Sequence, residues 1–238
     1  MNSDFTRKRK VYKSNNLVEA SYQLSLSEGR ILLACIAKID PCKTIIKDMD
    51  FKITADEYSE IFNIPIKQSY KTLHEATNRL FDRRIRMEDE GGCLIREIRW
   101  LQEKAVYHEG YGAVSLRFSD HVSKYLSMLI PPFTKYQLSK VSGLNSYYAV
   151  RLYEMLIQFK STGLFLISLE SFKIRLGLDG RYSRFTDFKR RVIIPAVKEL
   201  QAKSNLKIEW TTIREKGAVN KLQFRFNEYD QVVRNFEY

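Results

Sequence analysis

Between residues 181 and 203 the chain gathers side chains that suit the binding of a polyanion. Seven of them are basic and two are acidic, which gives this segment a net charge of +5. Arginine donates paired hydrogen bonds to guanine edges and to phosphate oxygens, and a helix that enters the major groove contacts DNA near its N-terminus. The basic residues are Arg181, Arg184, Lys189, Arg190, Arg191, Lys198 and Lys203. We therefore interpret the segment as the candidate DNA-reading element, with a solvated basic helix face as the alternative.

An apolar stripe in the same segment predicts a helix with one face on a core. Its members recur every four residues: Phe188, Val192, Pro195 or Ala196, and Leu200. The side chains expected on the solvent side are Arg184, Asp187, Arg190 and Arg191. A proline inside a helix removes a backbone donor, so we expect a kink or a short break at Pro195.

Other candidate DNA contacts flank this helix or lie far from it in the sequence. Arg181 and Ser183 precede it in an open loop, and a hairpin expected at 206–226 carries Lys216 and Lys221 at its tip with Arg214 beside them. A helix in the first half offers Lys67, Gln68 and Lys71 on its polar side. The candidate DNA-binding set is therefore Arg181, Ser183, Arg184, Asp187, Lys189, Arg190, Arg191, Arg214, Lys216, Lys221, Lys67, Gln68 and Lys71.

The distribution of charge favours a nucleic-acid partner. The net charge is +12, of which residues 1–128 carry +3 and residues 129–238 carry +9. A folded basic domain indicates nucleic acid first and an anionic membrane second, and the remaining reading is a soluble protein that happens to be basic.

Motifs for catalysis or for a bound cofactor are missing. The chain has no GxxxxGK[ST] motif, its three histidines are scattered, and its three cysteines show no metal-ligand spacing. We therefore expect a binding protein that is not an enzyme and that uses neither a metal nor another cofactor. The sparse cysteines and the lack of a long apolar run predict a cytoplasmic protein with no membrane partner.

The first half shows the element order of a winged helix. Ser25 and Glu28 have the spacing of a capping box, and so do Thr54 and Glu57, so two helices are expected to begin there. A longer helix follows from Pro65, with a stripe of Leu73, Ala76, Leu80 and Phe81. Residues 85–118 then alternate around glycine turns as β-hairpins, with 94–101 as one strand. Helix, short helix, longer helix and hairpin is the order of a winged helix.

The second half repeats this order at an offset near 120 residues. Leu73, Ala76 and Leu80 then correspond to Ile193, Ala196 and Leu200. Pro131-Pro132 cannot continue a helix, and we place the boundary there. The predicted fold is α+β with two tandem winged-helix domains: an N-terminal domain at 1–128, a linker at 129–137, and a C-terminal domain at 138–238 that is the main DNA-binding domain.

Several ordered motifs resemble the iteron-binding replication initiators of theta-replicating plasmids. They are SNNLVEASYQLSLSEGRILLACIAKI, ITADEYSEIF, SYKTLHEATNRLFDRRI, SYYAVRLYEML and FKRRVIIPAVKELQAKSNLKIEW. The resemblance covers roughly residues 10–227. It implies a double-stranded DNA-binding protein that binds repeats at a plasmid origin, a dimer that represses its own promoter at an operator, an active monomer, and host replication initiator and helicase partners. It places the recognition helices at 183–203 and at about 67–82.

Two alternatives stay open from the residues themselves. A transcription regulator with tandem winged helices and no replication role would need the same DNA face, and a nicking or joining enzyme is the alternative from another class. For self-association we expect the N-terminal domain to supply the contact, through its apolar hairpins at 85–118.

Overall fold

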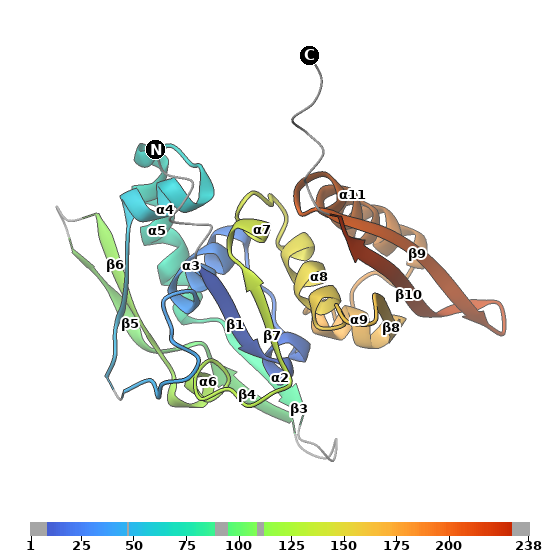
Figure 1. Ribbon diagram of the computed structural model, residues 1–238, viewed down its shortest axis with the longest axis horizontal. Helices are drawn as coiled ribbons and strands as arrows, with labels where there is room; N and C mark the ends of the chain where they lie inside the picture. Colours follow the sequence, from blue (N-terminus) through green and yellow to red (C-terminus); the bar gives the residue numbers. More distant parts are fainter. Residues whose placement is uncertain (1–8, 47, 89–94, 109–111, 230–238) are drawn as a thin grey trace. The chain divides into compact units, whose positions relative to one another are not determined.

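The structure is a computed structural model in which the chain forms two compact units. It describes residues 9–46, 48–88, 95–108 and 112–229, with the backbone alone for 104–108. Unit 1 is Met1–Gly143 and unit 2 is Leu144–Tyr238. The expected turn at Gly91-Gly92, Gly110 of the second turn, Arg7 and Lys8 of the basic N-terminus, and the last nine residues lie outside the described part. Figure 1 shows the elements of each unit along the chain.

The three longest helices of unit 1 precede its hairpins. These helices are α3 (Leu26–Ile36), α4 (Ala55–Phe62) and α5 (Ile66–Phe81), with strand β2 (Phe51–Thr54) before α4. The following strands are β3 (Arg84–Glu88), β4 (Ile95–Arg99), β5 (Leu101–His108) and β6 (Ala113–Phe118). The remaining elements are β1 (Lys10–Ser14), α2 (Asn15–Glu19), α6 (Asp120–Ser123), β7 (Phe133–Gln137) and α7 (Ser139–Ser142).

Both predicted hairpins of unit 1 are confirmed. Strand β3 pairs antiparallel with β4, and β5 pairs antiparallel with β6, whose other edge takes β2. The segment 94–101, expected to be one strand, is divided at Trp100, whose side chain is fully buried. The indole therefore lies in the core at the point where the chain passes from one sheet to the other.

Unit 2 repeats the arrangement with fewer elements. Helix α8 (Tyr147–Ile157) is followed by β8 (Leu164–Ser168), α9 (Leu169–Arg175), a helical segment at 185–203, β9 (Leu206–Glu215) and β10 (Ala218–Glu228). Strands β9 and β10 form the long hairpin seen in Figure 1. The sheet order is β8-β10-β9, and the corresponding order in unit 1 is β2-β6-β5. The strand between α3 and α4 in unit 1, and the strand between α8 and α9 in unit 2, therefore pairs with the last strand of its hairpin, which is the winged-helix topology.

The division between the units lies beyond the predicted linker at 129–137. Strand β7 occupies most of that range and pairs along its whole length with β1, so the segment belongs to the sheet structure of unit 1. The structure places the division at Gly143 and Leu144 instead. Lys135 and Lys140 then count with unit 1, so the net charges become +5 for unit 1 and +7 for unit 2.

One predicted capping box is confirmed and the other is half formed. The Ser25 hydroxyl accepts from the Glu28 amide, and the Glu28 carboxylate accepts from the Ser25 amide. Thr54 caps α4 in the same way, but the Glu57 carboxylate binds Arg9 at 2.6 Å and Lys38 at 2.7 Å instead of the cap amide. Two cations within reach outcompete one neutral donor for that carboxylate.

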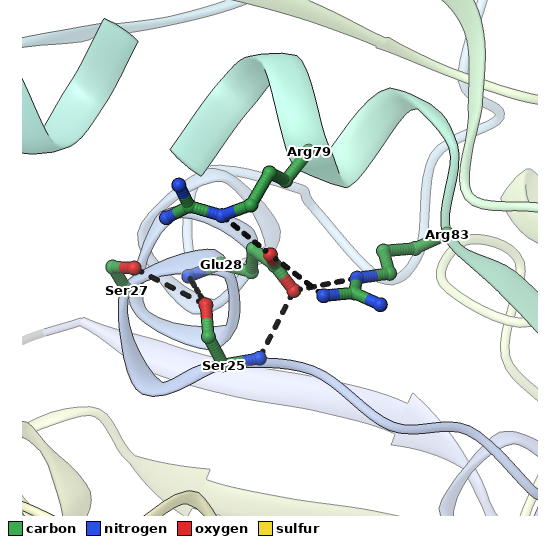
Figure 2. A network of polar contacts seen from close by, with 5 residues as sticks. All are labelled: Ser25, Ser27, Glu28, Arg79 and Arg83. Carbon is green, nitrogen blue, oxygen red and sulfur yellow. Dashed lines mark hydrogen bonds and ion pairs between the residues drawn. The ribbon is translucent and has the colours of Figure 1, made fainter. Parts of the chain in front are cut away.

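A buried carboxylate fastens α5 to the start of α3 (Figure 2). Glu28 is fully buried and accepts from Arg83 Nε at 2.8 Å and from Arg79 Nε at 3.2 Å, in addition to the Ser25 amide at 2.9 Å. Burial by itself raises the pKa of a carboxyl group, but the hydrogen bonds from Arg83, Ser25 and Arg79 and the charge of Arg83 bring the pKa of Glu28 below its usual value. The ionised form is therefore the one that the fold selects.

We predict that Glu28→Gln destabilises unit 1 by about 1–3 kcal/mol, because charge-assisted hydrogen bonds to two arginines are lost. Larger losses are not expected, since the side chains of Arg79 and Arg83 are 49% and 39% exposed and stay hydrated. Urea unfolding can be followed through Trp100 in a Trp210→Phe background, because these are the only two tryptophans. Glu60→Gln removes an exposed carboxylate of α4 and is the matched control.

The difference in stability between the parent and Glu28→Gln should depend on pH. A carboxyl group whose folded pKa is lowered adds stability that is complete above its unfolded pKa of about 4.3 and is lost as the pH falls through the folded value. The stability difference between the parent and Glu28→Gln should therefore be full at neutral pH and should close in acid. A difference that is constant down to acid pH, or equal losses in Glu28→Gln and Glu60→Gln, would contradict the assignment.

Candidate nucleic-acid interface

The predicted DNA-reading element is one continuous helical segment of three parts, which we name the recognition segment. It consists of α10 (Phe185–Phe188), the π-helical turn η1 (Lys189–Ile193) and α11 (Ile194–Lys203). Its buried side chains are Phe188, Val192, Ile193, Ala196, Val197 and Leu200. The predicted stripe is confirmed with Ala196 as its third member, because Pro195 is exposed.

The structure shows no break of the helix at Pro195, and the departure from α-helical geometry is the π-turn η1, which ends two residues before the proline. The N–H of Ile194 donates to the carbonyl of Lys189, five residues earlier, in place of the four of an α-helix. Pro195 follows near the start of α11, where it cannot donate the α-helical hydrogen bond to the Arg191 carbonyl. The chain stays helical on both sides, so the proline coincides with a change of helix type and does not end the helix.

The cations of the recognition segment differ in what they contact. Arg184, Arg190 and Arg191 are exposed, whereas Asp187 is half-buried and binds Arg190 at 3.2 Å. Lys189 is exposed as a residue, yet its ammonium lies 5.6 Å from the centre of the Trp210 ring on β9. That contact directs Lys189 toward the hairpin, so the three arginines are better placed than Lys189 to reach a bound partner.

The loop before the recognition segment is fastened to the core through Tyr182. Tyr182 has a φ of 57°, a conformation that side chains rarely adopt, and its carbonyl accepts from Lys173 Nζ of α9 at 2.7 Å. Lys173 also lies over the Phe188 ring, and the Tyr182 ring packs against the same phenylalanine at 5.8 Å. Arg181 and Ser183, on either side of Tyr182, are exposed on a loop that these contacts hold against the core. Sequence reasoning missed Lys173, which no motif marks.

The wing hairpin corrects the predicted place of Lys221. The turn has only two residues, Lys216 and Gly217, both with positive φ, so the strands stay paired up to Glu215 and Ala218. Lys216 is therefore at the tip, and Arg214 beside it donates to the Gly217 carbonyl at 2.8 Å. Lys221 lies farther down β10, half-buried and aligned with Ser168 of β8, and is not a tip residue.

The candidates of unit 1 lie in the first turns of α5. Lys67, Gln68 and Lys71 are all exposed, and Pro65 at the N-cap position provides no side-chain cap. The buried side of the helix carries Leu73, Ala76 and Leu80 as predicted, while Phe81 is half-exposed under Arg99. The structure therefore brings the three candidates together, but on a different unit from the recognition segment.

Within the described residues, no group of His, Cys, Asp and Glu side chains could hold a metal ion. No described helix has both the length and the apolar character that a membrane crossing requires. The interface candidates are thus polar and cationic surface groups on two helices, a loop and a wing.

Known proteins resemble this chain across both units. Residues 10–157 match the family described as "Initiator Replication protein, WH1", and residues 168–226 match "Initiator Rep protein, WH2". A "Replication initiation protein" of Escherichia coli is 28% identical over 205 residues, a match that spans 83% of this chain and 64% of that protein. The "PI protein" of Escherichia coli is 26% identical, over 94% of this chain and 84% of that protein.

A solved structure shares the fold. The Pi initiator protein, determined in complex with iteron DNA, superposes with a TM-score of 0.79 at 24% identity and covers 92% of this chain and 97% of its own. The matched family consists of DNA-binding replication initiators that are not enzymes, which removes the nicking-enzyme alternative. The chain belongs to the initiator replication protein family and carries both of its winged-helix domains, WH1 and WH2.

Proposed function

We propose that the protein initiates the replication of a plasmid by binding repeated double-stranded DNA sites, the iterons, at its origin. The observation that carries this proposal is the match of one chain to both domains of the initiator family, 10–157 and 168–226. The structural relative that was solved on iteron DNA supports the choice of ligand. A transcription regulator without a replication role is the second candidate, since it would use the same DNA-binding surface.

The recognition segment supplies the main DNA contacts in this proposal. Residues 181–203 hold +5 of the +7 net charge of unit 2, and the exposed guanidinium groups of Arg184, Arg190 and Arg191 lie at the N-cap and in the first turns of one helix. Opposite them, Phe188 and Leu200 anchor that helix in the core. Lys216 at the wing tip and Arg181 in the loop add flanking cations for phosphates. Lys67, Gln68 and Lys71 of unit 1 add a second, weaker set of contacts.

The dimer that represses its own promoter is assigned to unit 1. Strand β4 of the β3–β4 hairpin has no second partner strand among the described residues, and Ile95 on it is 54% exposed. An edge strand with an exposed aliphatic side chain is suited to pairing with a second copy. The monomer would then be the initiating form, with host initiator and helicase proteins as its partners.

We predict that Arg190→Ala and Arg191→Ala each weaken binding to the cognate repeat by about 1–3 kcal/mol where the side chain reads a base. A side chain that contacts phosphate should instead weaken all sequences alike and lower the salt slope by about 1. If about six to ten phosphates are contacted, the affinity of the parent should fall roughly 10³–10⁵-fold between about 50 and 200 mM salt. Titrations of labelled repeat and scrambled duplexes measure both quantities.

The matched control is Lys160→Ala, which removes one exposed cation of unit 2 outside the recognition segment, where it pairs with Glu228. It should change cognate binding far less than either arginine variant. Cognate affinity that is untouched in Arg190→Ala and Arg191→Ala would show that these residues are not in the interface.

The replication role is tested by transformation. A plasmid that carries the cognate repeats and no other origin should be maintained when this protein is supplied, and lost with the Arg190→Ala, Arg191→Ala double variant. Repression of a reporter by the protein, without maintenance of the plasmid in any suitable host, would favour the transcription regulator.

We predict that Ile95→Glu shifts the full-length protein from dimer toward monomer in sedimentation equilibrium, because a carboxylate would be buried at the strand edge. Ile46→Glu, at an aliphatic side chain that is 73% exposed and lies outside the hairpin, is the control and should leave the dimer intact. Equal dimer stability in the two variants would remove the β4 edge from consideration.

A further inference from the structure

The burial pattern of the recognition segment changes its period at the π-turn. Phe188 is buried and the next three residues are exposed, after which two are buried, two exposed and two buried. The three consecutive exposed residues are Lys189, Arg190 and Arg191. Farther along, Ile194 and Pro195 are the exposed pair between the buried pairs. The interval between buried positions is therefore longest where the three cations lie.

An unbroken α-helix fits this pattern poorly. Each residue of an α-helix turns by about 100°, so the twelve residues from Phe188 to Leu200 would leave these two side chains about 120° apart. Ile193 would stand about 140° from Phe188 on the solvent side, and Arg191 would turn to within about 60° of it. Phe188 and Leu200 are fully buried and Ile193 is 1% exposed, so an α-helix would need a buried face about 180° wide, from Phe188 to Val197, with the exposed Lys189 near its middle.

The π-turn resolves the conflict by taking up one extra residue. With roughly 80° per residue in the turn, Val192 and Ile193 fall on either side of the direction of Phe188, and Arg190 and Arg191 both lie more than about 110° from it. The following α-turns then carry Ala196, Val197 and Leu200 along the same core face. Pro195 has no N–H to offer the Arg191 carbonyl, which disfavours an α-turn at this place.

We propose that the π-turn is a one-residue insertion in the DNA-reading helix that adds a cation to its exposed face without rotating the rest of the helix. This inference rests on the proposed function for its DNA part. Arg191 is the added residue in the sense that its removal restores α-helical spacing from Phe188 to Leu200. With Phe188 held in the core, the turn presents two neighbouring guanidinium groups to DNA, with Arg191 more than about 110° from Phe188 where an α-helix would place it within about 60°.

The test is a deletion. A full-length variant that lacks Arg191 and carries Pro195→Ala should fold with a melting temperature within about 3 °C of the parent, because its eleven-residue spacing brings Phe188 and Leu200 to within about 20° in an α-helix. The matched variant Arg191→Ala with Pro195→Ala loses the same guanidinium but keeps the extra residue. The two should bind a cognate repeat duplex with affinities within about threefold and prefer it over a scrambled duplex to the same degree.

A second deletion provides the contrast. A variant that lacks Lys198 and carries Pro195→Ala also loses one residue and one cation, but from the regular part of α11. Keeping the π-turn would then rotate Leu200 by about 100°, and closing it would turn Ile193 and Val197 out of the core. We expect a melting temperature more than about 8 °C lower and loss of preference for the cognate repeat.

The outcomes separate this inference from the proposed function. An unfolded Arg191 deletion, or deletions of Arg191 and Lys198 that behave alike, would overturn the insertion whatever the protein binds. A well-folded Arg191 deletion that loses sequence preference while Arg191→Ala, Pro195→Ala retains it would overturn the claim that the rest of the helix keeps its rotation. Failure of the parent protein to prefer the repeat would instead count against the proposed function, and the folding comparison would still decide the geometry.

Discussion

The direction of the candidate DNA contacts on the recognition segment depends on one constraint, which is that Phe188 and Leu200 must occupy the same core although twelve residues separate them. A helix has no freedom to rotate part of its length, so the chain meets the constraint by changing its hydrogen-bond spacing from four residues to five. The change falls where three cations are adjacent in sequence. Crowding of like charge is costly on an isolated helix, but here Arg190 is paired with Asp187 and Lys189 is drawn to Trp210, which lowers that cost.

In unit 1 the corresponding helix, α5, is oriented by polar contacts and keeps ordinary α-helical spacing. In α5 the buried residues Leu73, Ala76 and Leu80 recur at three and four residues, so no change of helix type is needed. The end of this helix is held by Arg79 and by the adjacent Arg83, which donate to the buried Glu28 of α3. A buried carboxylate requires fully formed hydrogen bonds, so the contacts of Arg79 and Arg83 with Glu28 fix how α3 and α5 meet. The two units thus share a topology and differ in what orients their third helix.

Most of the architecture was predictable from local patterns, because caps, stripes and hairpins are encoded by neighbours. Ser25 with Glu28 marks a helix start, and alternation at 206–226 marks the wing, and both predictions are confirmed. Contacts across long sequence separations were not predictable: β7 pairs with β1, which moved the domain division, and the partners of Glu28 lie more than 50 residues away. The π-turn did leave a sign in the sequence: Phe188, Val192, Ala196 and Leu200 recur every four residues, which is more than the 3.6 residues of an α-helical turn. The assignment of individual residues to DNA stays a prediction.

The revised division of the chain also changes how charge supports function. Net charges of +5 and +7 are too similar to separate the roles of the units, so the earlier contrast of +3 and +9 loses its weight. What distinguishes unit 2 is the concentration of its positive charge, since residues 181–203 alone carry a net charge of +5. In unit 1 the cations Arg9, Lys38, Arg79, Arg83 and Arg117 are engaged with carboxylates of the same unit. Unit 2 also holds paired cations, such as Arg190 with Asp187 and Lys203 with Glu199, so the local concentration of positive charge is the physical basis for proposing the stronger DNA contacts on unit 2.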